Sequence, residues 1–124
     1  MFTMKKLTQK EEEILSYFWD KGPLFVRELL EFQDDPKPHY NTLSTIVRAL
    51  EEKGYIGFKA YGNTYQYYAL ISREAYRKKS LNTLVGKYFG NSYTRVVSSL
   101  IEEEKLSVEE LQELIEEIKN KRQD

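Results

Sequence analysis

Five polar side chains with hydrogen-bonding chemistry lie close together in the middle of the chain. They belong to Asn41, Thr42, Ser44, Thr45 and Arg48. Asparagine can pair with adenine in the DNA major groove, hydroxyl groups can donate or accept, and a threonine methyl group can pack on thymine. No acidic residue, which phosphate would repel, occurs between Lys37 and Ala49. The residue types in this stretch therefore favour contact with double-stranded DNA.

The spacing of apolar residues predicts that these polar side chains share the outer face of one helix. The apolar stripe consists of Leu43, Ile46, Val47 and Leu50, at positions i, i+3, i+4 and i+7. The helix is expected to open near Pro38 to Tyr40 and to run to about Lys53. Gly54 is placed to end it as a left-handed cap.

Two helices are predicted before this one. Thr8 and Glu11 form the capping-box pattern T-x-x-E ahead of an apolar run, and Gly22-Pro23 ends that first helix at about Lys21. A second, short helix follows. Its expected inward residues are Val26, Leu29, Leu30 and, as a further candidate, Phe32.

A β-hairpin is predicted after the third helix. Tyr55–Ala60 and Thr64–Leu70 are rich in aromatic and β-branched residues and flank Tyr61-Gly62-Asn63, where glycine and asparagine tolerate a positive φ. Tyr67 is expected in the core. Three helices and a hairpin are the element order of a winged helix-turn-helix, in which two helices brace a third that fits the DNA major groove. The predicted fold is therefore mainly α with a small β-hairpin.

The C-terminal part carries more apolar surface than the winged helix needs to cover itself. Three apolar helical stripes run from Leu81 to Ile118, and a second capping box joins Ser107 to Glu110. A two-fold dimer is the commonest way to bury such faces. A monomeric bundle packed on its own winged helix is the alternative. We expect a DNA-binding domain at residues 1–72 and a helical dimerisation domain at residues 73–124. The expected dimer contacts are Leu84, Tyr88, Val97, Leu100, Leu111, Leu114, Ile115 and Ile118.

Composition excludes several classes of function. The chain has 124 residues, with 19 Lys+Arg against 20 Asp+Glu and a net charge of -1, which excludes coating of nucleic acid by charge alone. No cysteine and a single histidine exclude disulfides and multi-histidine metal sites. Asp35, His39 and Ser44 are the residue types of a hydrolytic triad but lack a nucleophile elbow. We therefore expect no enzyme, no cofactor and no membrane span, and a cytoplasmic location.

Four stretches of the chain resemble the penicillinase-repressor (BlaI/MecI/CopY) family of bacterial winged-helix regulators. They are LTQKEEEILSYFWDKGP at Leu7–Pro23, HYNTLSTIVRALEEKGYI at His39–Ile56, YQYYALISREAY at Tyr65–Tyr76 and LIEEEKLSVEELQELIEEI at Leu100–Ile118. They occur in the family's order and spacing and cover nearly the whole chain. The resemblance implies a homodimeric repressor with an N-terminal winged helix on a palindromic operator and C-terminal helices that form the dimer.

The resemblance also implies site residues. It adds Tyr40 to the DNA-facing set on the third helix, and it adds Lys59 and the tip at Tyr61–Thr64, including Asn63, on the wing. Two features depart from the family pattern. The tip has no Arg or Lys, and the absence of cysteine removes the pairs through which the copper-responsive branch senses metal. Residues 88–91, Tyr-Phe-Gly-Asn, fall where the β-lactam branch is cleaved, so a regulatory protease or sensor is a candidate partner.

The sequence therefore predicts a homodimeric, sequence-specific transcriptional repressor that controls antibiotic-resistance or stress genes. The alternative is a winged-helix module that binds another protein, which the near-zero net charge favours. A salt titration separates the two, because DNA binding weakens steeply with salt.

Overall fold

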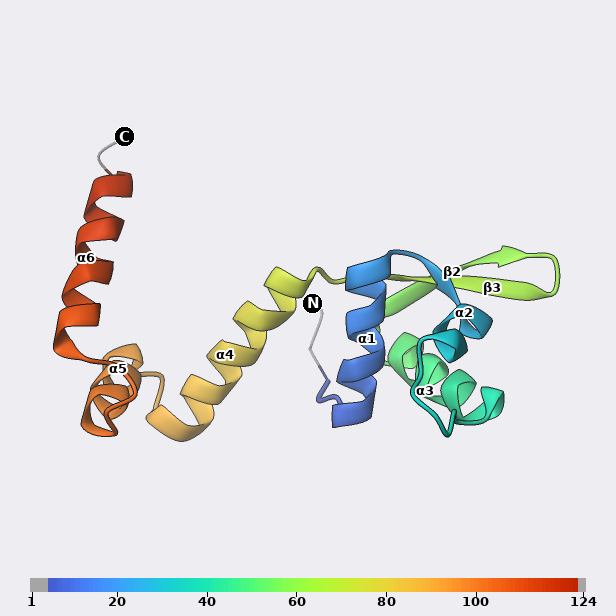
Figure 1. Ribbon diagram of the computed structural model, residues 1–124, viewed down its shortest axis with the longest axis horizontal. Coiled ribbons are helices and arrows are strands. Elements are labelled where there is room, and N and C mark those ends of the chain that lie inside the picture. The colour runs from blue at the N-terminus through green and yellow to red at the C-terminus, as the bar shows by residue number, and fades with distance from the viewer. Residues whose placement is uncertain (1–4, 123–124) are drawn as a thin grey trace. The chain divides into compact units, whose positions relative to one another are not determined.

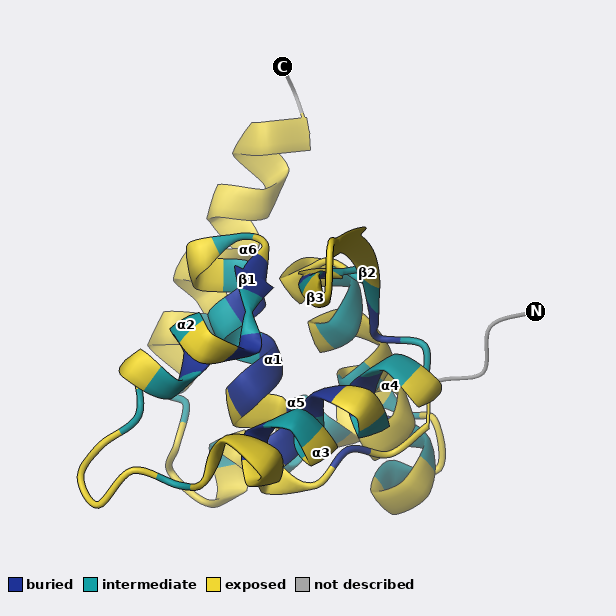
Figure 2. Cartoon of the chain, turned by 90° about the vertical axis from the view of Figure 1, so that its right-hand side faces the viewer, coloured by how far each residue is buried: buried dark blue, intermediate teal, exposed yellow. Residues whose placement is uncertain are grey.

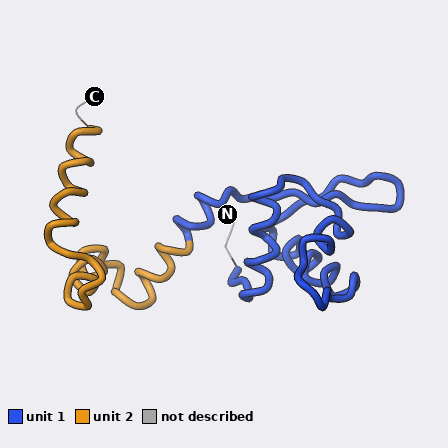
Figure 3. Tube along the Cα trace, in the orientation of Figure 1, with its two compact units in different colours: residues 1–79 blue, residues 80–124 orange. Residues whose placement is uncertain are grey.

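The computed structural model describes residues 5–122 as six helices and three short strands (Figure 1). In chain order these are α1 (Gln9–Lys21), β1 (Leu24–Phe25), α2 (Val26–Glu31), α3 (Tyr40–Glu52), β2 (Ile56–Tyr61), β3 (Thr64–Ala69), α4 (Arg73–Phe89), α5 (Tyr93–Glu102) and α6 (Val108–Arg122). The predicted fold class, mainly α with a small β element, is confirmed. The chain divides into two compact units, Met1–Lys79 and Ser80–Asp124 (Figure 3).

Local signals in the sequence fix the ends of the helices in the first unit. The Thr8 hydroxyl accepts from the amide of Glu11 at 3.1 Å, and the Glu11 carboxylate accepts from the amide of Thr8 at 2.8 Å, which confirms the capping box. Gly22 ends α1 with φ +84°, and Gly54 follows α3 with φ +86°. Both glycines occupy the left-handed region, where a side chain would be strained.

The core of the first unit lies where α1 and α2 pack on α3. Ile14, Leu15 and Leu29 are fully buried there, opposite the stripe on α3, of which Leu43, Val47 and Leu50 are fully buried (Figure 2). Tyr67 is buried in this core, as predicted. The two supporting helices therefore hold α3 by one face and leave its other faces free.

Phe32 is not an inward residue of α2, contrary to the sequence expectation. It is exposed, and its ring stacks on Tyr17 of α1 with centroids 5.8 Å apart and planes at 9°. α2 ends at Glu31 and Phe32 is its C-cap, so the ring leaves the helical spacing that would turn it inward.

The hairpin is part of a three-stranded sheet rather than a two-stranded one. β1 pairs antiparallel with β3, in register Leu24↔Tyr67, and the strand order is β1-β3-β2. A strand of two residues is too short to show an alternating pattern, so sequence reasoning missed it. At the tip Tyr61 pairs with Thr64, and of the two turn residues Gly62 takes a positive φ of +61°. Glycine in the first turn position is the pattern of a type II′ hairpin.

The second unit contains most of α4 together with α5 and α6. A break at Gly90 and Asn91, both with positive φ, separates α4 from α5 as predicted. The second capping box is confirmed by reciprocal hydrogen bonds between Ser107 and Glu110 at 3.0 and 3.1 Å. The first compact unit extends to Lys79, and Tyr76 of α4 packs against its core. The functional boundary at 72/73 stays a prediction.

Candidate nucleic-acid interface

Helical geometry divides the predicted DNA-facing residues of α3 between two faces. Tyr40, Ser44 and Arg48, at positions i, i+4 and i+8, face the wing and line a hollow beside it. Asn41 and Thr45 are exposed, do not line the hollow and lie on the side of α3 opposite the buried stripe. Thr42 is exposed at the edge of that outer surface. The structure therefore separates residues that the sequence placed in one group.

Two of the α3 side chains donate hydrogen bonds within the helix. The Thr45 hydroxyl donates to the carbonyl of Asn41 at 2.8 Å, so its proton is in use while its methyl group and lone pairs remain available. The Arg48 guanidinium donates to the Ser44 hydroxyl at 3.2 Å. Among the ion pairs of the described residues none includes Arg48, so its charge is free to meet an anion.

The start of α3 has no acidic residue in its first turn. His39 is the N-cap, but its side chain makes no capping hydrogen bond. The positive end of the helix dipole and the first-turn amides are therefore not neutralised by a side-chain cap, which is the arrangement that attracts phosphate.

The wing presents one lysine and a polar tip. The ammonium of Lys59 lies 5.4 Å from the centre of the Tyr61 ring, and the Thr64 hydroxyl donates to the carbonyl of Tyr61 at 2.9 Å. Lys59 and Asn63 are both exposed. Within the described wing, Lys59 supplies the cationic charge that the tip itself lacks.

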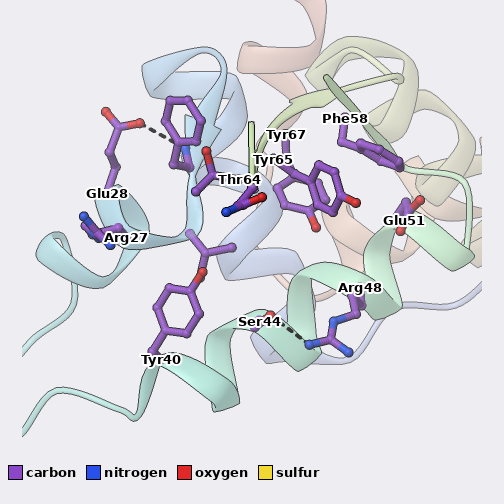
Figure 4. Close-up of a pocket in the computed structure, with 13 residues that line it drawn as sticks. Arg27, Glu28, Tyr40, Ser44, Arg48, Glu51, Phe58, Thr64, Tyr65 and Tyr67 are labelled. Atoms are coloured by element: carbon purple, nitrogen blue, oxygen red, sulfur yellow. Dashed lines mark hydrogen bonds between the residues drawn. The ribbon is translucent and has the colours of Figure 1, made fainter. Parts of the chain in front are cut away.

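A hollow of about 680 Å³, the wing hollow, lies between α2, α3 and the wing (Figure 4). Tyr40, Ser44 and Arg48 line it from α3, and Asn63 and Thr64 line it from the hairpin. It thus brings together predicted contacts from both the helix and the wing. Asn41, Thr42, Thr45 and Lys59 are not part of its lining.

The described tertiary structure also places an ion pair behind α3 that sequence reasoning missed. Lys53, the C-cap of α3, lies 2.7 and 3.0 Å from the two carboxylate oxygens of the buried Glu11 in α1. Burial acts to raise the pKa of Glu11, but hydrogen bonds from Lys53 and Thr8 outweigh burial and lower it. Nothing in the sequence signals a pairing across 42 positions.

A second unpredicted cluster fixes the start of α4 on α1. The Trp19 indole N–H donates to the carbonyl of Ile71 at 2.9 Å, and Tyr76 packs on the Trp19 ring with centroids 5.5 Å apart. Arg73 lies over the same ring and forms an ion pair with Asp20. The chain therefore leaves the sheet along a fixed path within the first unit.

The second unit exposes much of its apolar surface. Among its described residues Val85 is the one that is fully buried, and α6 is exposed along most of its length (Figure 2). Six of the eight predicted dimer contacts are exposed, namely Leu84, Tyr88, Leu100, Leu114, Ile115 and Ile118. Val97 and Leu111 are half-buried.

Residues 5–122 contain no group of three potential metal-ligating side chains. Over the same residues, no helix has the length and hydropathy needed to cross a bilayer.

Three helices around one core, with the third held outward beside a small sheet, define a winged-helix DNA-binding protein. Residues 7–120 match the family described as penicillinase repressor, and the chain belongs to that family. This confirms the resemblance seen in the sequence. The family is one of transcriptional repressors rather than enzymes, and the chain is a DNA-binding repressor of this type.

The chain is also similar to curated members of the family. The methicillin resistance regulatory proteins MecI of Staphylococcus aureus (strain N315) and Staphylococcus epidermidis are each 27% identical to it over 112 residues, which is 88% of this chain and 89% of theirs. MecI of Mammaliicoccus sciuri matches with the same identity and coverage. The similarity therefore extends over both units.

Proposed function

We propose that this repressor binds a palindromic operator as a homodimer and places α3 of each copy in the major groove. The observation that carries the proposal is the outer surface of α3, which is exposed, polar and free of carboxylates up to Glu51. Asn41 and Thr42 are suited to read base edges, and the Thr45 methyl group is suited to contact thymine. Arg48 and the uncapped start of α3 are suited to bind phosphate.

The wing is proposed to contact the neighbouring backbone. Lys59 supplies the charge, while Asn63 supplies hydrogen-bond donors at the tip. The phosphate strand between the two grooves would pass along the wing hollow, where Tyr40, Ser44 and Arg48 offer polar groups. This arrangement accounts for two kinds of residue on α3, with base contacts on the outer face and backbone contacts beside the wing.

Dimerisation is proposed through the second unit. On α6, Leu111, Leu114, Ile115 and Ile118 form a stripe at i, i+3, i+4 and i+7 that its own unit leaves largely uncovered. Helices with such a face rarely remain alone in water, and a second copy can cover it. Dimerisation would also double the number of phosphate contacts per complex, which offsets the small net charge of the chain.

The proposal extends to the regulated genes and to the inducing signal. The relatives are named as methicillin resistance regulators, which supports antibiotic-resistance or stress genes as targets. Residues 88–91 include the end of α4 and the two positive-φ residues that separate it from α5, which supports a role for this joint in cleavage by a regulatory protease. A repressor on chromosomal DNA would act in the cytoplasm.

Selection of bound sequences from random duplex DNA tests the proposal. We expect an inverted repeat whose half-sites are centred about 34–36 Å apart, or a multiple of that distance. Affinity for the selected duplex should fall steeply with salt. Enrichment of sequences without symmetry would refute the dimeric operator. Absence of duplex binding at low salt would refute the DNA-binding mode and favour a protein partner.

A further inference from the structure

We propose that the wing hollow binds a small zwitterion that carries an aromatic ring, of the chemical class of the aromatic α-amino acids. Its volume of about 680 Å³ is within the range of about 300–1,000 Å³ that small-molecule sites occupy. Three observations give the ligand its chemistry, namely an aromatic wall, a tyrosine hydroxyl without a partner and two unpaired opposite charges.

The aromatic wall is the face of the sheet that looks toward α3. The Phe58 and Tyr65 rings lie 4.6 Å apart between centroids, and Phe58 lies 6.0 Å from Tyr67. Phe58 and Tyr65 are nevertheless exposed, because the face they present borders the hollow. Opposite them, the Tyr40 ring of α3 is also exposed. A planar ring of the ligand can pack against Phe58 and Tyr65 in place of water.

Tyr67 supplies a hydrogen-bond donor at the base of this wall. Its side chain is nearly buried, with 7% exposed, yet its hydroxyl has no hydrogen-bond partner among residues 5–122. Figure 4 shows the hydroxyl ends of Tyr65 and Tyr67 directed into the space before α3. Burial and the charge of Glu51 raise the pKa of Tyr67, so the phenol keeps its proton at neutral pH. No buried side-chain polar atom among the described residues lacks a hydrogen-bond partner, so the Tyr67 hydroxyl is itself open to the hollow, where an occupant could accept its proton in place of water.

The two unpaired charges lie one turn apart on α3. Arg48 and Glu51 both line the hollow, and neither belongs to an ion pair within the described residues. A ligand carboxylate would accept from Arg48 and Tyr67, and a ligand ammonium would donate to Glu51. A simple aromatic acid could pair with Arg48 but would leave Glu51 without an opposite charge. A simple aromatic amine could pair with Glu51 but would leave Arg48 without one. A zwitterion satisfies both charges.

The two other charged lining residues lie on α2, and Arg27 adds a second cation that has no ion pair among the described residues. Glu28 is occupied, because its carboxylate accepts the amide of Phe25 at 2.9 Å and caps α2. Arg27 is exposed and lies on α2, across the hollow from α3. On α3 itself, the lining residues without an ion pair are one cation, Arg48, and one anion, Glu51.

Occupation of the wing hollow would oppose DNA binding, and this part of the inference rests on the proposed function. Tyr40, Ser44 and Arg48 are both lining residues and proposed DNA contacts. A ligand carboxylate on Arg48 would use the same guanidinium that a phosphate needs. The ligand would therefore act as an inducer that competes with the operator.

The test of the site uses the full-length protein without DNA and L-phenylalanine as the probe. Amide chemical shifts are followed by NMR to about 10 mM probe, which detects weak binding. We expect saturable shifts at residues that line the hollow. 2-Phenylethylamine, 3-phenylpropionate and L-leucine each lack one feature of the probe, and each should bind at least about tenfold more weakly. Absence of saturable shifts with L-phenylalanine, or equal binding of all four compounds, overturns the proposal.

A pair of matched variants tests the assigned charge. Glu51→Gln should weaken L-phenylalanine binding at least about tenfold while leaving the binding of 3-phenylpropionate unchanged or improved. Glu52→Gln removes the neighbouring exposed carboxylate, which does not line the hollow, and should leave L-phenylalanine binding unchanged. Both variants alter an accessible side chain, and the amide spectrum reports whether each is folded. Equal effects of the two substitutions would overturn the role of Glu51.

Competition is measured separately with the selected duplex. The protein concentration for half-saturation of DNA should rise in inverse proportion to the fraction of protein that L-phenylalanine leaves unoccupied. If the probe binds as described but DNA binding is unaffected, the overlap of the two sites is refuted while the ligand site remains. If no duplex binds although the probe does, the proposed function fails and the ligand site remains.

Discussion

Replacing Glu11 with glutamine should show that a buried ion pair holds α3 in place. Lys53 contacts both Glu11 oxygens, and the Lys53 ammonium also donates to the carbonyl of Lys6 at 3.2 Å. Glutamine keeps an oxygen for the amide of Thr8, so the Glu11→Gln substitution removes mainly the charge. A hydrogen bond to a charged group contributes about 1.5–3 kcal/mol. The Glu11 side chain is 7% exposed and that of Lys53 27%, so we expect a loss of about 1.5–2.5 kcal/mol.

A double-mutant cycle with Lys53→Met isolates the interaction between the two side chains. The free energy of unfolding is measured in urea at pH 7 and at one protein concentration, because a dimer's stability depends on concentration. Lys10 and Glu13 provide the control on the same helix. They lie 3.4 Å apart with half-exposed side chains, and exposed pairs of this kind contribute about 0.2–1 kcal/mol. A coupling energy for Glu11 and Lys53 no larger than that of the control pair would refute the reasoning.

The same pair predicts how stability depends on pH. The pKa of Glu11 is lowered in the folded protein, so its contribution is complete above the ordinary carboxyl pKa of about 4.3. The contribution is lost as the pH falls from that value through the folded pKa. The parent protein should therefore lose more stability between neutral and acid pH than Glu11→Gln does. Equal acid sensitivity in the two proteins would contradict the ion pair's role.

Three further predictions concern DNA binding and assembly. Arg48→Ala should weaken operator binding while the circular dichroism spectrum stays unchanged, since the Arg48 side chain is exposed and, among residues 5–122, hydrogen-bonds only to Ser44. An accompanying loss of helicity would instead show a structural role. Asn41→Ala should change the preferred base at one position of each half-site by about 1–3 kcal/mol in a binding selection, and a uniform loss across all sequences would assign Asn41 to the backbone. Leu114→Asp should produce monomers in sedimentation, and an unchanged dimer would place the interface away from α6.

Sequence reasoning predicted the helices well because their signals are local. Capping residues, breaking glycines and the i, i+3, i+4, i+7 stripe of α3 lie within a few positions of the structure that they specify. Phe32 marks where such reasoning fails. Its spacing matched the inward face of α2, but the helix ends one residue earlier, and the ring stacks on Tyr17 instead.

The candidate site was predicted in part. The residue types on α3 indicated DNA contact, and helical spacing alone could divide them into two faces. The wing hollow could not be predicted, because its walls come from α2, α3 and the hairpin, whose packing distances depend on the whole core. The unpaired state of Arg48 and Glu51 likewise depends on which side chains the fold brings near them.

Local patterns in the sequence establish that a polar, carboxylate-free helix follows two apolar ones and precedes a hairpin, because periodicity and turn chemistry act over short stretches of chain. What lies behind and beside that helix depends on how the distant elements pack. The contact of Glu11 with Lys53 and the pairing of the two-residue strand β1 with β3 both join segments far apart in the chain. Such contacts form where the buried core brings surfaces together, and no local pattern of residues records them.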